Sequence, residues 1–322
     1  MPQRPKVVIA ETLDDRCARW LGERAEVVWR RHDEGDRFGA ELADARGLVV
    51  RTYTRVDDAL LDRAPALRVV GRAGVGLDNV DLPACRARGV RVVYTPDANT
   101  QAVVEYVLAL ILDRIRPRAA FGPEINAEAF HRMRRELVGT QLDQLTLGIL
   151  GFGRIGKRLG RAAEALGVRV LVHDLLPEAG LRALAPYPFE FVDRAQLFAR
   201  SDVLSVHVDG RPENLGLIDA QALAQLRPSC LFINAARGML VDSAAVAAWL
   251  RAHEADGAYA LLDVHDPDEP PGPAYPLLGV ANARLLPHLA SRTHVALENM
   301  SWVVRDVVAV LEGREPQFPA WA

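Results

Sequence analysis

The stretch that decides the fold is Leu147-Gly148-Ile149-Leu150-Gly151-Phe152-Gly153-Arg154-Ile155-Gly156. An apolar run leads directly into the pattern Gly-x-Gly-x-x-Gly, and a helical pattern follows over residues 157–166. A second apolar run, over 168–172, ends in His173-Asp174. The order strand, glycine turn, helix, strand and acid is the context in which this motif predicts a dinucleotide-binding unit.

Each residue type in this motif has a physical role toward a dinucleotide. Gly151 permits the tight turn, Gly153 lets the backbone approach a pyrophosphate because it has no Cβ, and Gly156 lets the helix pack closely on the sheet. Arg154 and Ile155 stand at the helix N-terminus, where unpaired amides and the positive end of the dipole attract phosphate.

Asp174 favours NAD over NADP as the cofactor. Its carboxylate can accept hydrogen bonds from both hydroxyls of an adenosine ribose, and it would repel a 2′-phosphate. The following Leu175-Leu176 supplies no arginine that could hold such a phosphate.

The bulk composition excludes several classes of protein. The chain has 322 residues, enough for two domains, and half of them are apolar. A net charge of −3 favours neither nucleic acid nor an anionic membrane as a partner. The three cysteines are far apart and predict neither a metal site nor a disulfide framework. No hydrophobic signal segment or membrane span is found, so we expect a cytoplasmic protein.

Short apolar runs alternate with helical patterns along the whole chain, which predicts an α/β fold with parallel sheets covered on both faces. We expect a first domain formed by residues 1–98 plus 291–322 and a second formed by residues 99–290, because the amphipathic segment 291–312 could return to the first domain. The expected strands are residues 7–10, 27–29, 47–50, 67–70, 90–94, 147–150, 168–172, 203–208, 230–233, 258–262 and 283–286. The main expected helices are 13–21, 99–116, 217–226 and 242–250.

Three groups suited to acid–base chemistry follow successive strands of the second domain. Arg237 follows one strand, an acidic loop that contains Asp268 and Glu269 follows the next, and His288 follows the third. Arginine can hold the carboxylate of a 2-oxo acid, and histidine can exchange the hydroxyl proton while hydride moves to or from a nicotinamide. A carboxylate would orient the imidazole and favour its protonated form.

These motifs together resemble the D-2-hydroxyacid dehydrogenase family over nearly the whole chain. The matching pieces are residues 74–81 (GVGLDNVD), the glycine turn 151–156, residues 234–238 with Val241-Asp242, residues 262–264, and residues 287–291. The resemblance implies two doubly wound domains, one flavodoxin-like for substrate and one Rossmann-like for NAD, around a cleft in a homodimer.

The resemblance also implies roles for individual residues. Arg237, Glu269 and His288 match the catalytic arginine, glutamate and histidine. The amides of Val75 and Gly76 match those that bind the substrate carboxylate. Asp263 matches the residue that meets the nicotinamide carboxamide, and His207 and Ala236 match further residues of the NAD site. No metal is implied.

Within the family, the chain is most similar to the members that act on 3-phosphoglycerate in serine biosynthesis. Arg51, Arg72 and Arg134 match arginines of the phospho-substrate pocket, the last reaching from a partner subunit. The alternatives are a glyoxylate or hydroxypyruvate reductase and, in a different class, a non-catalytic NAD-sensing protein related to corepressors. The long C-terminal regulatory domain of many such enzymes is not expected here, and neither is serine feedback through it.

Two departures from the family pattern concern the site. After His207 the family usually has Pro-Leu-Thr, whereas this chain has Val208-Asp209-Gly210-Arg211, a new charge pair that we expect near the nicotinamide side, where it would alter how the cofactor is seated. The acidic loop after Asp263 is one residue longer than usual, so either Asp268 or Glu269 could be the catalytic acid. The Glu-Pro-Pro pattern favours Glu269.

Overall fold

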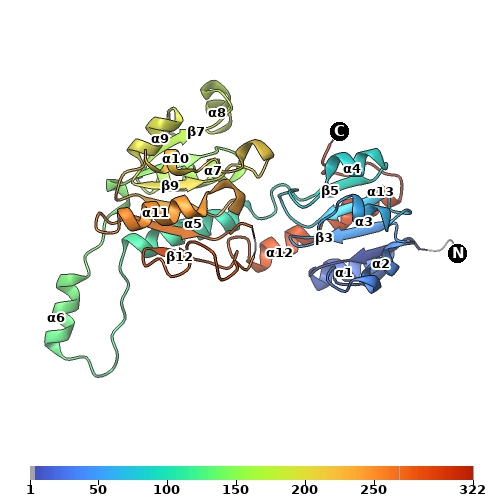
Figure 1. Ribbon diagram of the computed structural model, residues 1–322, viewed down its shortest axis with the longest axis horizontal. Coiled ribbons are helices and arrows are strands. Elements are labelled where there is room, and N and C mark those ends of the chain that lie inside the picture. The colour runs from blue at the N-terminus through green and yellow to red at the C-terminus, as the bar shows by residue number, and fades with distance from the viewer. Residues whose placement is uncertain (1–3, 268, 322) are drawn as a thin grey trace. The chain divides into compact units, whose positions relative to one another are not determined.

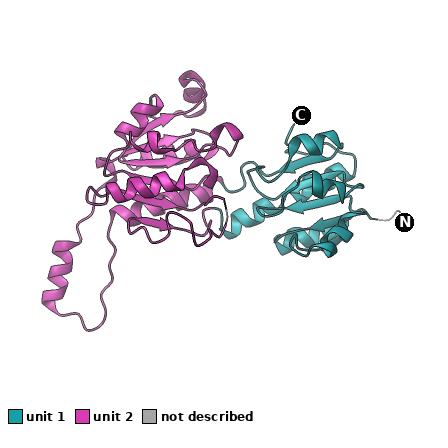
Figure 2. Ribbon diagram, viewed as in Figure 1, with its two compact units in different colours: residues 1–99, 291–322 teal, residues 100–290 magenta. Residues whose placement is uncertain are grey.

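The computed structural model describes residues 4–267 and 269–321, which form two compact units (Figure 2). Unit 1 combines the residues up to Asn99 with those from Ser291 onward, and unit 2 runs from Thr100 to Ala290. Each unit is built on one parallel sheet with helices between its strands. The fold class expected from the sequence is therefore confirmed.

Unit 1 has a five-stranded parallel sheet in the order β2-β1-β3-β4-β5. Each strand is four residues long and rich in valine, which suits a sheet that is covered on both faces. The bounds are β1 Lys6–Ile9, β2 Glu26–Trp29, β3 Gly47–Val50, β4 Val69–Arg72 and β5 Arg91–Tyr94. The interleaved helices are α1 Asp15–Gly22, α2 Asp36–Leu42, α3 Asp58–Asp62 and α4 Leu82–Ala87. Asp14, Asp57 and Asp81 cap three of these helices by accepting backbone N–H bonds.

The end of the chain returns to unit 1 as α12 (His294–Ser301) and α13 (Val304–Leu311), and α13 packs on β3, β4 and β5. Gly71 in β4 makes this close approach feasible, because a Cβ there would lie 2.5 Å from a methyl group of Val307. Beyond α13 the Ala320 amide bonds to the carbonyl of Val92, so the tail covers part of the edge strand β5.

Unit 2 has a seven-stranded parallel sheet in the order β12-β11-β10-β9-β6-β7-β8. Figure 1 labels β7, β9 and β12 of this sheet. The strands are β6 Thr146–Leu150, β7 Arg169–His173, β8 Glu190–Phe191, β9 Val203–Val206, β10 Leu231–Asn234, β11 Tyr259–Leu262 and β12 Ala283–Leu285. The order reverses at β6, where the chain first goes out through β7 and β8 and then returns to β9. In open parallel sheets, ligands bind beyond the carboxyl ends of the strands at such a reversal.

The sheet of unit 2 has an apolar core on each face. Strand residues alternate between the two cores, so that Ile149 points to one face and Leu150 to the other. The first core is covered by α5 (Thr100–Ile115) and α7 (Arg154–Ala165), and the second by α9 (Arg194–Arg200), α10 (Ala220–Leu223) and α11 (Ser243–Ala252). The short helix α8 (Glu178–Leu184) lies between β7 and β8 in the chain.

One part of unit 2 is separate from these layers. The segment between α5 and β6 carries α6 (Ala127–Glu136), which stands away from the sheet of its unit on two extended stretches (Figure 1). None of the residues of α6 is buried. In the described part of the chain, no helix is long and apolar enough to cross a membrane.

Two expected elements differ in the structure, and one element was not expected. The helix predicted over 217–226 is wrong in extent, because Ile218 pairs with Val241 and only Ala220–Leu223 is helical. The amphipathic segment 291–312 is broken into α12 and α13 rather than continuous. The two-residue strand β8 was not expected.

Candidate active site

The glycine turn has the geometry of a phosphate-binding loop. Gly151 has φ +91°, and a Cβ there would lie 2.8 Å from the carbonyl carbon of His207. A Cβ on Gly156 would lie 2.3 Å from the carbonyl oxygen of Gly151, so only glycine lets α7 start this close to the turn. Gly153 caps α7 without any side-chain hydrogen bond, and the space around it is open. The first amides of α7, which include those of Arg154 and Ile155, therefore fit a dinucleotide phosphate.

Asp174 lies directly after β7 and next to this turn. One of its carboxylate oxygens accepts the Phe152 amide at 2.6 Å, and the other accepts the Leu176 amide at 2.9 Å. The carboxylate therefore ties the glycine turn to the end of β7, and each oxygen keeps a lone pair that a ribose hydroxyl could use.

The structure brings His288 and Glu269, two of the predicted catalytic residues, into contact. His288 Nδ1 and Glu269 Oε2 are 2.7 Å apart, and the other Glu269 oxygen accepts the His265 amide at 3.0 Å. Burial would raise the pKa of the Glu269 carboxyl, but the hydrogen bond and charge of His288 outweigh it and leave that pKa below its ordinary value. Asp268, the alternative acid, lies outside the described residues.

The turn that follows His288 is held by a buried carboxylate. His288 has φ +53°, the one positive φ outside glycine among the described residues. Asp263 accepts the next two amides, those of Leu289 and Ala290, at 2.8 Å each, and its side chain receives a third bond from Tyr106 at 3.2 Å. Asp263 is 0 % exposed, and burial raises its pKa although the amides lower it. The predicted contact of Asp263 with nicotinamide stays a prediction.

Arg237 follows β10 in a loop whose backbone is held by the side chain of Asn234. The Asn234 side chain accepts the Ala236 amide at 3.0 Å and donates to the Arg237 carbonyl at 2.8 Å. The Arg237 guanidinium donates to the Ala236 carbonyl at 2.7 Å. A Cβ on Gly238 would lie 2.1 Å from the His265 carbonyl oxygen, so this loop lies against the loop that carries Glu269.

The loops that carry Arg237, Glu269 and His288 follow β10, β11 and β12, which are neighbouring parallel strands. Their carboxyl ends therefore open on the same edge of the sheet as the glycine turn.

His207 follows β9 and is held in its neutral form. Its Nε2 atom lies 2.8 Å from Ser205 Oγ, and its Nδ1 atom is buried without a hydrogen bond in the described part of the protein. Burial lowers the pKa of His207 to about 4. A neutral imidazole beside the glycine turn adds no charge to the nucleotide site.

In unit 1, Glu11 anchors the loop that carries Arg51. Its carboxylate accepts the amides of Arg51, Thr52, Tyr53 and Thr54 at 2.9–3.2 Å, and also the Thr54 hydroxyl at 2.8 Å. Burial raises the pKa of Glu11, but these bonds outweigh it and leave the pKa below its ordinary value. From the other side, Asn79 donates to the carbonyls of Arg51 and Thr54.

Arg51 is a buried cation. Its side chain is 9 % exposed, and no described residue forms a hydrogen bond or ion pair with the guanidinium. Burial lowers the pKa of Arg51, and repulsion by the nearby Arg292 lowers it further. Two like charges close together, one of them buried, are typical of a site that binds an anion.

The other predicted substrate residues of unit 1 follow β4. Arg72 folds over the turn, because a Cβ on Gly74 would lie 1.5 Å from its guanidinium. The amides of Val75 and Gly76 donate no hydrogen bond within the described part of the protein. These two amides can donate hydrogen bonds to a carboxylate, as the resemblance implies.

Arg134 is not brought near the other predicted residues of unit 2. It lies exposed near the end of α6, away from the sheet that carries the glycine turn and the His288 pair (Figure 1). Its contribution to a substrate site stays a prediction.

The sequence reasoning missed Glu11, Asn79, Tyr106 and Arg292. Glu11 could have been found, because it follows the end of β1 just as the predicted residues follow their strands. Arg292 follows no strand and precedes α12, so its proximity to Arg51 depends on how the returning segment packs. Among the described residues, no cluster of three or more metal-binding side chains occurs.

A family model matches most of unit 2. Residues 108–290 match the NAD-binding domain of the D-isomer-specific 2-hydroxyacid dehydrogenases. This range begins in α5 and ends at the turn after His288, so it covers nearly all of unit 2.

Curated relatives and solved structures extend the match to the whole chain. The (S)-sulfolactate dehydrogenase of Chromohalobacter salexigens is 38 % identical over 94 % of this chain and 96 % of that protein. The D-3-phosphoglycerate dehydrogenase of Mycobacterium bovis is 36 % identical over 94 % of this chain. The chain spans only 56 % of the length of that relative. The crystal structure of an NADPH-dependent glyoxylate/hydroxypyruvate reductase from Sinorhizobium meliloti, in complex with NADP and malonate, aligns with a TM-score of 0.80 at 30 % identity, covering 99 % of this chain and 97 % of that one.

Proposed function

Since this chain belongs to the D-isomer-specific 2-hydroxyacid dehydrogenase family, we propose that it interconverts a D-2-hydroxy acid and its 2-oxo acid, with 3-phosphoglycerate as the favoured substrate. Members of this family are NAD-dependent oxidoreductases that act on the CH–OH group. The observation that carries the proposal is the hydrogen bond between Glu269 and His288 on the edge of the sheet that holds the glycine turn.

The chemistry divides among three side chains and the cofactor. NAD, when bound, accepts or supplies the hydride at the C2 atom of the substrate. His288 takes the hydroxyl proton during oxidation and returns it to the carbonyl oxygen during reduction. Glu269 occupies Nδ1, so Nε2 is the atom left to exchange this proton. Arg237 suits the carboxylate, since a guanidinium can donate two parallel hydrogen bonds to it.

Two observations in unit 1 support a substrate with a second anionic group. Arg51 is buried without a hydrogen-bonding partner among the described residues, and Arg292 adds positive charge close to it. A substrate that carried only a carboxylate would leave this charge uncompensated. A phosphate on C3 would meet it with oxygens suited to guanidinium groups. With this substrate, the reaction would belong to serine biosynthesis in the cytoplasm.

A sulfonate on C3 is the second candidate, because it presents the same tetrahedral oxygens. The relative named (S)-sulfolactate dehydrogenase, which matches this chain over nearly its full length, favours this alternative. A glyoxylate or hydroxypyruvate reductase, the third candidate, would use the same acid–base pair without needing the cation pair in unit 1.

The substrate proposal is tested by NADH oxidation with 3-phosphohydroxypyruvate, 3-sulfopyruvate, hydroxypyruvate and glyoxylate as acceptors. We expect the highest kcat/KM with the phosphorylated acceptor. Arg51→Gln should lower that value about tenfold or more and leave glyoxylate reduction nearly unchanged, because the lost bonds are charge-assisted. Equal losses for both acceptors would contradict a phosphate role for Arg51, and a preference for sulfopyruvate would identify the second candidate. NADH binding without turnover of any acceptor would instead favour the non-catalytic sensor.

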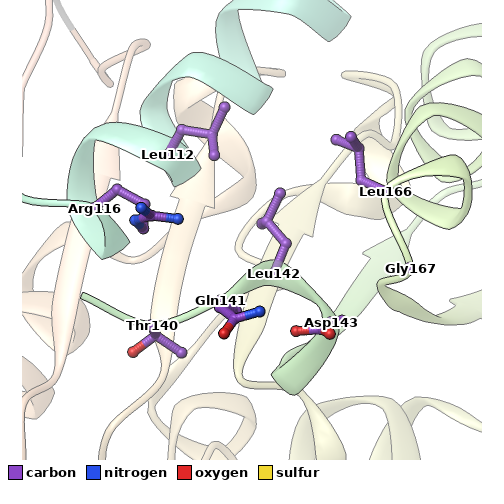
Figure 3. A pocket seen from close by; sticks show the side chains of 8 residues that line it. All are labelled: Leu112, Arg116, Thr140, Gln141, Leu142, Asp143, Leu166 and Gly167. Carbon is purple, nitrogen blue, oxygen red and sulfur yellow. The ribbon is translucent and has the colours of Figure 1, made fainter.

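We also propose that the protein is a homodimer formed through the segment between α5 and β6 that carries α6, which we call the arm. Phe121, Leu137 and Val138 of the arm are 58 %, 43 % and 78 % exposed. At the base of the arm lies an open pocket of about 330 Å³, with leucines from three segments on its walls (Figure 3). It is lined by Leu112, Arg116, Thr140, Gln141, Leu142, Asp143, Leu166 and Gly167. The arm of a second copy would cover these exposed apolar side chains and this pocket. Arg134 of each copy would then lie against the partner subunit.

Sedimentation velocity tests the dimer. Val138→Asp should shift the protein toward monomer, because it would place a charge within the proposed apolar interface. Leu175→Asp is the matched control, since Leu175 is 81 % exposed but lies outside the arm. If both variants kept the oligomeric state of the parent protein, the arm would not be the interface.

A further inference from the structure

The ends of three neighbouring strands place a second charged group beside Asp174. In the sheet, β6 lies between β7 and β9, so the glycine turn is flanked by Asp174 on one side and by the loop after β9 on the other. The contact between that loop and the turn is direct, because a Cβ on Gly151 would lie 2.8 Å from the Val208 nitrogen. The same loop continues into Asp209 and Arg211. This departure from the family pattern was expected on the nicotinamide side, but it lies instead within range of the charge of Asp174.

Asp209 holds Arg211 in a two-point ion pair. Arg211 Nε and Nη2 donate to the two Asp209 oxygens at 2.7 and 2.5 Å. Asn214 fixes Asp209 in turn, since its amide group donates to the backbone carbonyl of Asp209 at 2.9 Å and to its carboxylate at 3.1 Å. The carboxylate of Asp209 therefore occupies the guanidinium edge that would otherwise be available to a phosphate.

The charge of Asp174 also acts on Arg211. The pKa of Arg211 is raised chiefly by Asp209, and further by the charges of Glu213 and Asp174. Arg211 thus lies within range of the charges of three carboxylates, and it is hydrogen-bonded to one of them, Asp209.

We propose that Asp209 determines cofactor specificity together with Asp174, by sequestering Arg211 from the 2′-phosphate of NADP. The inference rests on the assignment of Asp174 to the ribose of NAD. A 2′-phosphate placed there would meet the negative charge of Asp174, and it could recruit Arg211 only by breaking the pair with Asp209. The uncharged 2′-hydroxyl of NAD is not repelled by Asp174, and its binding leaves the pair of Asp209 and Arg211 intact. Without Asp209, the guanidinium fork would be available to bind the phosphate.

The test is a fluorescence titration of NADH and NADPH binding, which needs no substrate and so remains informative if the proposed reaction is wrong. Asp209→Asn should tighten NADPH binding about tenfold and change NADH binding by less than about twofold. The double variant Asp209→Asn/Arg211→Gln should lose this gain, because the freed cation is absent.

Glu213→Gln is the matched control. It removes one negative charge from the same loop but leaves the pair of Asp209 and Arg211 intact, so we expect NADPH binding to change by less than about twofold. Equal gains in Asp209→Asn and Glu213→Gln would show that net charge alone acts, and would overturn the proposal. A gain that persists in the double variant, or no gain in Asp209→Asn, would overturn it as well.

Discussion

The backbone at His288 shows how neighbouring residues fix the side chain that we propose for proton transfer. A left-handed φ is unfavourable for most residues, although histidine tolerates it better than branched residues do. Asp263 offsets this cost by binding the two amides that follow, and Glu269 then fixes the imidazole through Nδ1. The position of the His288 imidazole therefore depends on two carboxylates: Asp263 holds the backbone and Glu269 holds the ring.

The first prediction separates proton transfer from cofactor binding. His288→Ala should lower kcat by about 10²- to 10⁴-fold, the usual contribution of a general acid or base. Glu269→Gln keeps a side chain of the same shape near Nδ1, so it should lower kcat less. The dissociation constant of NADH, measured by fluorescence, should stay within about twofold in both variants. A large loss of NADH binding would mean that His288 has a structural role.

The second prediction concerns the buried imidazole of His207. Its pKa lies at about 4 in the folded protein and at an ordinary 6.5 in the unfolded chain. The unfolded state therefore binds a proton that the folded state does not, and stability falls as the pH drops from 6.5 to 4. The group contributes at most about 3 kcal/mol to this fall.

Urea denaturation at several pH values checks the role of His207. His207→Gln should flatten the dependence of the unfolding free energy on pH between 6.5 and 4. His131→Gln, in the exposed helix α6, should leave that dependence unchanged. Parallel curves for the parent protein and His207→Gln would contradict this account.

At the scale of elements, the loop after β3 depends on a carboxylate from the end of β1. In Glu11→Gln, the side-chain NH₂ group would face the backbone N–H groups that now donate to Glu11, and two donors cannot form a hydrogen bond. We therefore expect the unfolding free energy to fall by about 2 kcal/mol. The pKa of Glu11 is depressed in the folded state, so its stabilisation is present above an ordinary value of 4.5 and is lost as the pH falls through the lower folded value. The loss caused by Glu11→Gln, measured by urea denaturation, should therefore be full at pH 7 and shrink below about pH 4.5.

A kinetic readout shows whether Glu11 also positions Arg51. KM for a phosphorylated acceptor should rise in Glu11→Gln with little change in kcat, because the loop carries a binding cation rather than the acid–base pair. Glu34→Gln, which removes a half-buried carboxylate that pairs with Arg30 elsewhere in unit 1, is the control. An equal rise in KM for glyoxylate would mean that the loop acts on substrates in general.

The elements show which parts of this molecule a sequence can predict. The glycine turn, the strand ends and the pair of Glu269 with His288 were predictable, because each follows from local order along parallel strands. The extent of α10 was not, since Ile218 is held by the Leu240 carbonyl and by a bridge to Val241, which are contacts from a later segment. The break after Ser301 has no glycine or proline to mark it. Arg292 reaches Arg51 only through the packing of that same returning segment.

At the scale of the whole molecule, two units with separate cores should unfold separately. Val307 in unit 1 and Val246 in unit 2 are both 0 % exposed, so each Val→Ala substitution should cost about 2 kcal/mol. Hydrogen exchange measured by mass spectrometry should show faster exchange in β4 and β5 for Val307→Ala, and faster exchange in β10 and β11 for Val246→Ala. If each substitution loosened both sheets equally, the two units would be one cooperative body.

The return of α13 to the first sheet has a consequence for synthesis on the ribosome. Unit 2 lies between the two segments of unit 1, so β4 and β5 emerge long before the helix that covers them. At ordinary rates of translation this interval lasts on the order of ten to forty seconds. During that time the face around Gly71 remains uncovered, so the nascent chain exposes an apolar surface that chaperones could protect while unit 2 is being synthesised.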